Sequence, residues 1–289
     1  MAVMIQSDDV GERRVMTRGG AMEAYFRGER LYGDDFDSEG LLRWYSEEED
    51  GYAGIEDSDL SDGQYGYAAL NQWYAWRFIR SQGRRFAHCV SLGGARGDDV
   101  TPLAPIIDRF TVIEPSRTFW TREIGGKPAT YLGPQISGEI AIETRSVDLV
   151  TSLGTLHHIA NVSFVMREVG RILAPGGFFV LREPIHAMGD WRQARDGKTR
   201  NERGIPVRLL KSWLTDAGLE PVRTRYCIFA PFERLRRTSG GRNLWNSRWI
   251  MPLDEFFSGL FSWNDAYLRN RFFHKIAPGC VCIIAKRSS

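Results

Sequence analysis

Long hydrophobic runs are absent from this sequence, and so is an excess of either charge. No apolar stretch approaches the ~20 residues that span a bilayer, and the N-terminal MAVMIQSDDVGERR lacks the apolar core of a signal peptide. Lys and Arg number 38 against 36 Asp and Glu, a net charge of +2, which disfavours a protein built to grip nucleic acid. We therefore expect a cytoplasmic protein with no membrane span and no nucleic-acid partner.

Cysteine and histidine are also scarce. The four cysteines, Cys89, Cys227, Cys280 and Cys282, form no CxxC pair, so we interpret them as reduced thiols of the core rather than as a disulfide framework or a metal site. The remaining composition is that of an ordinary globular protein, with 43% hydrophobic and 26% charged residues. A chain of 289 residues is long enough for one elaborated domain or two small ones.

The first part of the chain differs in character from the rest. Residues 30–63 are acidic and aromatic and are interrupted by glycine and aspartate, which indicates short helices and turns in an acidic arm or lid. Residues 65–80 predict an amphipathic helix, with a stripe of large apolar side chains for core packing. Tyr67 and Asn71 of this helix could instead face a ligand. We place this N-terminal helical arm at residues 1–84.

From residue 86 onward, short apolar runs alternate with helical stretches. The predicted strands are 87–92, 110–114, 147–153, 177–183, 219–228 and 280–285, and the predicted helices are 98–107, 115–123, 161–174 and 205–217. This alternation predicts an α/β fold with a mostly parallel sheet covered on both faces. Residues 231–276 are too many for a simple loop, so we predict an inserted lid with its own short helices before the final strand. The second domain then spans residues 85–289.

A glycine-rich loop follows the first of these strands. The run VSLGGARGDD (90–99) leads into a predicted helix, and Gly93, Gly94 and Gly97 permit a sharp turn and a close approach of the backbone to a ligand. Glu114 ends the next strand, where a carboxylate can accept hydrogen bonds from both ribose hydroxyls of a nucleoside. The loop is not the GxGxxG that accommodates a pyrophosphate. The pattern indicates a cofactor with an adenosine but no phosphate.

A longer motif lies at residues 146–184, which read SVDLVTSLGTLHHIANVSFVMREVGRILAPGGFFVLREP. This segment resembles the "FDLV…LHHI…REIxRVLKPGG…EP" pattern of class I, Rossmann-like S-adenosylmethionine-dependent methyltransferases. The matching residues are Val147-Asp148-Leu149-Val150, Leu156-His157-His158-Ile159, Arg167-Glu168-Val169, Leu173-Ala174-Pro175-Gly176-Gly177 and Glu183-Pro184. The glycine loop resembles the family's D-x-G-x-G-x-G, with Ser91 replacing the acidic residue and Ala95 the middle glycine. The resemblance covers about residues 86 to 185.

The resemblance implies a doubly wound, seven-stranded sheet whose last strand, at 280–285, is antiparallel. It also implies S-adenosyl-L-methionine as the cofactor, with S-adenosylhomocysteine as the product. By position in the family's motifs, the cofactor-binding residues are expected to be Gly93, Gly94, Ala95 and Gly97 at the methionine, Glu114 at the ribose, Pro115, Ile136 and Ser137 near the adenine, and Ser152 and Leu153 facing the cofactor.

The candidate catalytic residues follow two adjacent strands of the predicted sheet. His157 and His158 come after one strand, and Glu183 and His186 follow the next, so all four lie at the carboxyl edge where open α/β sheets bind ligands. A neutral imidazole suits removal of a proton from an acceptor hydroxyl. We expect His157 or His158 to be the base, with Glu183 orienting it or binding the acceptor; His186 is the alternative base. His88 precedes a core strand, and we assign it a structural role.

The acceptor has no readable code. Polar and basic groups at 183–206, including Asp190, Arg192, Arg195, Lys198 and Arg200, favour a negatively charged or polyhydroxylated acceptor or form a plain solvated surface. O-methylation of a small hydroxylated metabolite, sugar or glycan is the leading interpretation. N- or C-methylation of a small molecule, and a cofactor-binding pseudoenzyme or assembly partner, are the alternatives. We predict no metal, since only Glu183 and Asp190 are placed to converge on one, and a homo-oligomer stays open.

Overall fold

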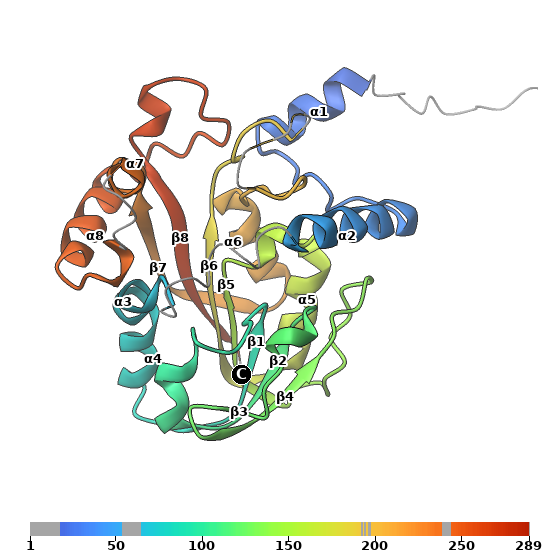
Figure 1. Cartoon of the computed structure of the whole chain (residues 1–289), viewed down its shortest axis with the longest axis vertical. Helices are drawn as coiled ribbons and strands as arrows, with labels where there is room; N and C mark the ends of the chain where they lie inside the picture. The colour runs from blue at the N-terminus through green and yellow to red at the C-terminus, as the bar shows by residue number, and fades with distance from the viewer. Residues whose placement is uncertain are drawn as a thin grey trace, which may run out of the picture.

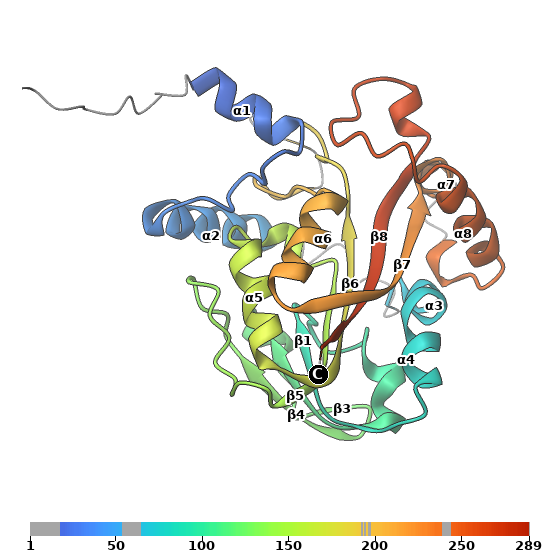
Figure 2. The ribbon, with the colours of Figure 1, turned by 180° about the vertical axis from the view of Figure 1, so that it is seen from behind.

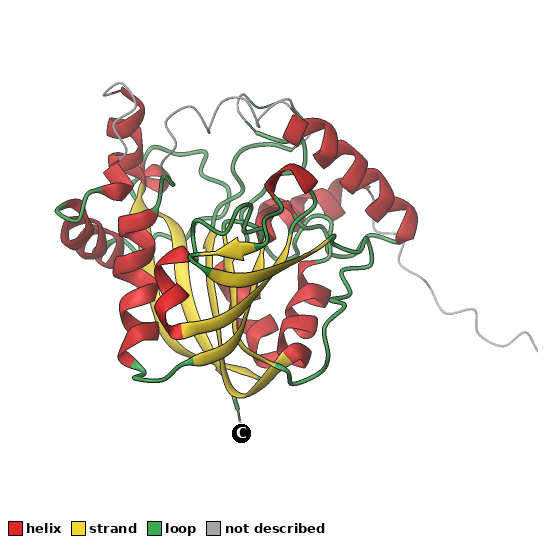
Figure 3. Cartoon of the chain, turned by 60° about the horizontal axis from the view of Figure 1, so that its bottom comes forward, coloured by secondary structure: helices red, strands yellow, loops and turns green. Residues whose placement is uncertain are grey.

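The computed structural model describes residues 18–53, 65–191, 193, 195, 198–238 and 244–288. Its centre is an eight-stranded sheet in the order β3-β4-β2-β1-β5-β6-β8-β7, with helices on both faces (Figures 1 and 3). The strands are β1 (Phe86–Leu92), β2 (Ile107–Ile113), β3 (Glu123–Ile124), β4 (Lys127–Leu132), β5 (Val147–Leu153), β6 (Leu173–Pro184), β7 (Leu219–Phe229) and β8 (Pro278–Arg287).

The strand directions confirm the doubly wound α/β prediction. Strands β4, β2, β1, β5 and β6 are mutually parallel, and β8 runs antiparallel to both β6 and β7. The final strand is therefore the reversed one. The predicted count of seven strands was wrong by one, because the two-residue β3 folds back on β4 through Gly125 and Gly126, both in the left-handed region of φ.

The two faces of the sheet are covered by different helices. The helices α5 (Val162–Ile172) and α6 (Val207–Asp216) pack on one face, in a cluster with Val90, Val150 and Phe179. The other face is covered by a continuous helical stretch comprising α3 (Ala68–Asn71), the π-helical turn Gln72–Trp76 and α4 (Arg77–Ser81). All four cysteines are free and buried, as predicted.

Two predicted helices are replaced by other structure. Residues 98–107 form only a 3-10 turn, Thr101–Ile106, because Pro102 and Pro105 remove amide donors and obstruct an α-helix. Residues 115–123 form a single turn, Arg117–Phe119, followed by the β3–β4 hairpin. Strand β4 escaped prediction because it is short, contains Pro128 and lies near the edge of the sheet, where its side chains are only partly buried.

The first two helices of the N-terminal arm and the insertion flank the sheet on opposite sides (Figures 1 and 2). The arm contributes α1 (Arg18–Phe26) and α2 (Ser38–Ala53); its residues 1–17 and 54–64 lie outside the described part. The insertion contributes α7 (Ala230–Thr238) and α8 (Ile250–Leu260), and α8 packs against β7. No helix among the described residues is long and apolar enough to cross a membrane.

Candidate functional site

The predicted site residues converge at the carboxyl edge of the sheet, on the side that faces α1 and α2 in Figure 1. The glycine loop follows β1, Glu114 follows β2, and the segment that contains His157 follows β5. Glu183 is the penultimate residue of β6, and it lies beside the segment that contains His157. Parallel strands deliver these groups to one edge because their carboxyl ends coincide.

Each glycine of the loop is held where a side chain would not fit. A Cβ on Gly93 would lie 2.4 Å from Thr155 Cγ2, one on Gly94 would lie 2.4 Å from Ser91 Oγ, and Gly93 and Gly97 both have φ in the left-handed region. Thr155 also donates its hydroxyl to the carbonyl of Leu92, at 2.9 Å. The loop is therefore packed against the segment that follows β5, and of its glycines Gly93 is exposed whereas Gly94 and Gly97 are buried.

Glu114 is buried at the end of β2 and faces the glycine loop. Its carboxylate accepts hydrogen bonds from the main-chain amides of Ala95, at 3.1 Å, and Ser116, at 3.0 Å. These contacts fix the carboxylate beside the glycine loop, where each of its oxygens can accept more than one hydrogen bond. Ala95 adopts φ of 44°, which brings its amide to this carboxylate.

The other residues predicted to bind the cofactor differ in their surroundings. Pro115, Ile136 and Ser137 are exposed, and the carbonyl of Ser137 accepts a hydrogen bond from Asn161 at the start of α5. Leu153 is half-buried at the end of β5. Ser152 is fully buried, and its hydroxyl donates to Glu183 at 3.3 Å. The side chain of Ser152 thus supports Glu183.

Glu183 and His157 form a buried hydrogen-bonded pair. His157 Nδ1 lies 2.8 Å from Glu183 Oε2, while the other oxygen of Glu183 accepts from the amides of Thr155 and Leu156, each at 3.0 Å. Burial opposes ionisation of Glu183, but His157 and these amides outweigh it and lower its pKa. An ionised Glu183 requires a proton on His157 Nδ1, which leaves Nε2 as the acceptor nitrogen.

The imidazole of His157 is held neutral by its surroundings. Its burial, and then the neighbouring His158, lower the pKa of His157, while Glu183 and Glu202 act in the opposite direction. Glu202 Oε1 lies 3.9 Å from His157 Nε2. The imidazolium ring formed when Nε2 takes up a proton would therefore lie between two carboxylates, Glu183 on the Nδ1 side and Glu202 on the Nε2 side, which stabilises its charge.

His158 is turned toward the arm rather than toward Glu183. Its Nδ1 lies 3.1 Å from Glu48 Oε2 of α2, and its carbonyl accepts a hydrogen bond from Trp44 of the same helix at 2.8 Å. The rings of His157 and His158 are 4.1 Å apart between centroids. Sequence reasoning did not single out Glu48 and Glu202, because nothing in the acidic arm or in 183–206 marks which carboxylates face inward.

The remaining two histidines near the sheet have other surroundings. His186 accepts a hydrogen bond from the amide of Met188 at 3.2 Å, and burial, together with Arg269 and Lys198, lowers its pKa to about 3. Such a weakly basic imidazole is a poor general base, so the geometry does not favour the alternative base. His88 contacts Thr111 and Arg109 within the sheet, which agrees with a structural role.

His157, His158 and Glu202 also form a group with metal-ligand chemistry. One ligand atom from each lies within 4.8 Å of the others. Lys198 Nζ lies 3.2 Å from Glu202 Oε1 and already supplies a positive charge there. The predicted convergence of Glu183 with Asp190 does not describe this group, since Glu183 is hydrogen-bonded to protein donors.

Four basic residues of 183–206 form hydrogen bonds or ion pairs within the protein. Arg195 donates to the carbonyls of Met188, Thr199, Arg200 and Glu202, and the fully buried Arg203 donates to those of Tyr32, His157, Ile159 and Ala160. Lys198 and Arg200 pair with Glu202 and Glu47. Their interpretation as an acceptor-binding cluster is disfavoured for these four; Arg192 lies outside the described residues.

Arg182 is a functional candidate that sequence reasoning missed. It is buried, its carbonyl accepts from the Gly154 amide, its Nε lies 3.2 Å from Asn71 Oδ1, and its guanidinium lies 4.5 Å from the ring of Tyr67. Among the described residues, no carboxylate forms an ion pair with it. A buried cation without a carboxylate is costly unless a ligand supplies one.

These features fit a bound S-adenosylmethionine. The Ser91 hydroxyl, buried next to Gly94, has no hydrogen-bond partner among the described residues, Gly93 is exposed, and Glu114 faces the same loop. Arg182 lies level with Leu153, at the same height of the sheet. The loop, a carboxylate for the ribose and a cation for a carboxylate thus occupy one edge.

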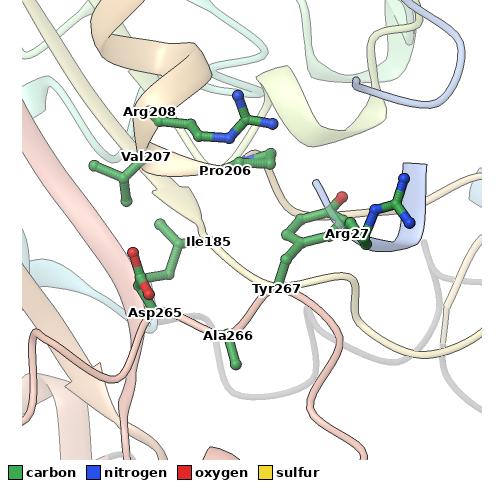
Figure 4. A pocket seen from close by; sticks show the side chains of 8 residues that line it. All are labelled: Arg27, Ile185, Pro206, Val207, Arg208, Asp265, Ala266 and Tyr267. Atoms are coloured by element: carbon green, nitrogen blue, oxygen red, sulfur yellow. The ribbon is translucent and has the colours of Figure 1, made fainter. Parts of the chain in front are cut away.

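A cavity of about 220 Å³ lies beyond this edge, between α1, the start of α6 and residues 265–267 (Figure 4). Its walls include Ile185, Tyr267 and two guanidinium groups. Both are engaged, since Arg27 pairs with Glu23 and Glu29, and Arg208 donates to the Gly28 carbonyl. The cavity is lined by neither the glycine loop nor His157, so it does not define the reaction centre.

Comparison with known proteins agrees with this geometry. Residues 77–224 match the family model described as a methyltransferase domain. A putative sarcosine dimethylglycine methyltransferase from Galdieria sulphuraria has a similar structure, at 17% identity, 76% coverage of this chain, 85% of the other and a TM-score of 0.51. An S-adenosylmethionine-dependent methyltransferase from Mesorhizobium loti also has a similar structure, at 16% identity, with 73% of this chain and 97% of the other covered and a TM-score of 0.48. No curated protein sequence matches. The chain belongs to the methyltransferase-domain family and is a methyltransferase whose cofactor is S-adenosyl-L-methionine.

Proposed function

We propose that the protein O-methylates a small hydroxylated metabolite, a sugar or the end of a glycan, with His157 as the general base. The observation that supports this most directly is the hydrogen bond of 2.8 Å between His157 Nδ1 and the buried Glu183. It fixes the tautomer in which Nε2 is a proton acceptor, and a base is required for a hydroxyl acceptor more than for an amine.

In this mechanism, His157 Nε2 takes the proton of the acceptor hydroxyl. Glu183 is a positioning residue, which orients the ring and stabilises the imidazolium through Nδ1. Glu202 offers a second carboxylate to the protonated ring, at 3.9 Å from Nε2. S-adenosylmethionine supplies a methyl group that is already activated as a sulfonium, so the protein mainly positions the acceptor and manages its proton.

Residues of the sheet edge would hold the cofactor. Gly93, Gly94, Ala95 and Gly97 would line its methionine end, and Glu114 would accept from the ribose hydroxyls. Arg182 would bind the methionine carboxylate, and the Ser91 hydroxyl, which no described residue contacts by a hydrogen bond, would lie beneath the amino end. Pro115, Ile136 and Ser137 remain proposed neighbours of the adenine, and Leu153 a neighbour of the sulfonium side.

The enclosure of the base supports a small acceptor. Glu48 and Trp44 of α2 contact His158 next to it, and Arg203 binds the arm and the His157 segment together. A folded macromolecule could not reach a base enclosed in this way, so the burial of His157 favours a small acceptor or a chain end. N- or C-methylation and a pseudoenzyme are the remaining alternatives, and nothing in the geometry favours either.

Acceptor screening tests the proposal. S-adenosylhomocysteine release would be followed with sugars, nucleotide sugars and phenols on one side and amine acceptors on the other. We expect turnover with a hydroxyl acceptor that excess EDTA does not change, since Lys198 already neutralises Glu202. Turnover only with amines would refute O-methylation, and turnover that requires an added divalent ion would replace the His157 base with a metal at His157, His158 and Glu202. Calorimetric absence of S-adenosylhomocysteine binding would indicate a pseudoenzyme.

A further inference from the structure

The insertion before β8 exposes a row of large apolar side chains. Leu253, Phe256 and Leu260 recur at helical spacing on α8 and are 50%, 62% and 54% exposed. Trp249 directly precedes the helix and Trp263 follows it, at 75% and 74%. Spacings of three and four residues place Leu253, Phe256 and Leu260 on one face of the helix, with Trp249 and Trp263 at its two ends. We call these five residues the α8 patch.

The opposite face of α8 is firmly attached to the sheet. Asp254 is buried and accepts hydrogen bonds from the amides of Ile228 and Phe229 and from the hydroxyl of Tyr74. Met251 and Ser258 are buried beside it. Because this face is committed to the fold, the α8 patch cannot rotate inward, and its exposure is a fixed property of the surface.

Two further aromatic rings extend the apolar surface. Phe272 and Phe273 are 69% and 75% exposed. Asn264, next to Trp263, donates to the carbonyl of Phe273 at 2.7 Å, so the loop folds back to the end of α8. Exposed apolar surfaces of this extent mark interaction sites in soluble proteins.

The charges around the patch indicate what covers it. Residues 231–276 contain eight Arg and Lys and four Asp and Glu, a net charge of +4 in a chain whose total is +2. Arg248, Arg271 and Lys275 are exposed beside the apolar residues, while Glu233 and Glu255 are paired with Arg236 and Arg225. Of the four acidic residues, only Asp265 is classed as exposed.

We propose that the α8 patch docks the protein on an anionic lipid surface. Tryptophan and phenylalanine beside arginine and lysine are the composition of helices that lie in a membrane interface, where the apolar face inserts and the cations contact anionic headgroups. A second copy of the chain is the poorer occupant. A two-fold interface would bring the same cationic rim together with few exposed carboxylates to balance it.

Vesicle sedimentation with the full chain tests this proposal. We expect binding to vesicles of phosphatidylcholine and phosphatidylglycerol, at least ~10-fold weaker binding to phosphatidylcholine alone, and weakening by added salt. The double variant Phe256→Glu, Trp263→Glu should bind at least ~10-fold less, since it removes two inserted rings and adds two negative charges. Leu42→Glu, an exposed leucine on α2, is the control and should bind as the wild type does.

Two measurements keep the outcome decisive. S-adenosylhomocysteine affinity should be equal in all variants, which shows that α8 and the sheet remain folded. No wild-type binding to the mixed vesicles, or equal binding by the double variant, would overturn the proposal. The proposal would also be overturned if the wild type is a dimer in light scattering and binds no vesicles, while the double variant is a monomer. The patch would then be an interface between copies of the chain.

Discussion

Arg182 offers the sharpest test of how the cofactor is held. Its guanidinium is buried against Tyr67 and Asn71, and no described carboxylate forms an ion pair with it. If the methionine carboxylate of the cofactor is its partner, Arg182→Met leaves that carboxylate in a dry site without a counter-charge. Loss of one partner of a buried charge pair costs roughly 2–5 kcal/mol, which corresponds to about 30-fold to several-thousand-fold weaker binding.

Calorimetry with two ligands isolates this effect. S-adenosylhomocysteine carries the carboxylate, whereas 5′-methylthioadenosine keeps the adenosine and sulfur but lacks the amino-acid part. We expect Arg182→Met to weaken binding of the first by the stated factor and to change binding of the second less than ~2-fold. Arg182→Lys should recover part of the loss, because the charge returns without the planar fork.

The thermal stability of the unliganded variant provides the control. Arg182→Met removes the desolvation cost of a buried cation but also its hydrogen bond to Asn71, so the two effects oppose each other and the variant should unfold at a temperature close to that of the wild type. An equal loss of affinity for both ligands, or an unchanged affinity for S-adenosylhomocysteine, would refute the assignment of Arg182 while leaving the family membership untouched.

Three further predictions concern the base, the pH dependence and the packing. His157→Gln should lower kcat by roughly 10²–10⁴-fold. Because His158 lowers the pKa of His157, His158→Gln should raise that pKa and move the acid limb of the pH profile of kcat/KM to higher pH. If the acid limb does not move, His157 is not the titrating base. The pKa of His186, about 3, lies below its unfolded value near 6.5, so between these pH values the native state binds fewer protons than the unfolded state and stability falls as pH falls. At pH 5, this effect lowers the free energy of unfolding by up to about 2 kcal/mol relative to neutral pH. In urea unfolding, the free energy of His186→Gln should therefore decrease less between pH 7.5 and pH 5 than that of the wild type. A Cβ on Gly170 would lie 2.3 Å from the carbonyl oxygen of Ala217. Gly170→Ala should therefore lower the free energy of unfolding in urea by about 1–3 kcal/mol and leave kcat unchanged. If the variant is as stable as the wild type, α5 and α6 can move apart without cost.

The sheet could be predicted from sequence because its strands carry a local signal. Buried strands have mostly apolar sequences, with unbroken apolar runs in β6 (Phe178–Leu181) and β8 (Val281–Ala285), and strand ends at the carboxyl edge locate His157 and Glu183 without knowledge of packing. The helix predicted at 98–107 does not form, because Pro102 and Pro105 lack the amide donors that an α-helix requires. This effect outweighs the helical spacing of the apolar residues in the segment.

The partners of these residues could not be predicted, because they come from distant parts of the chain. Glu48 reaches His158 from 110 residues away, and Arg182 meets Asn71 across 111 residues. Alternation within β6 shows only that Arg182 and Glu183 point to opposite faces. Which face receives the cofactor and which receives the base depends on the helices packed there, and that is a property of tertiary structure.

Thr155 connects two sites that are usually considered separately. Its methyl group fills the space beside Gly93, its hydroxyl binds the end of β1, and its amide binds Glu183. In the mechanism proposed above, the spacing between methyl donor and proton acceptor is thus built into a single residue and exists before either molecule arrives. If so, substitutions in the α2 residues that contact His158 would change which acceptor fits, while the spacing between methyl donor and base would stay as Thr155 sets it.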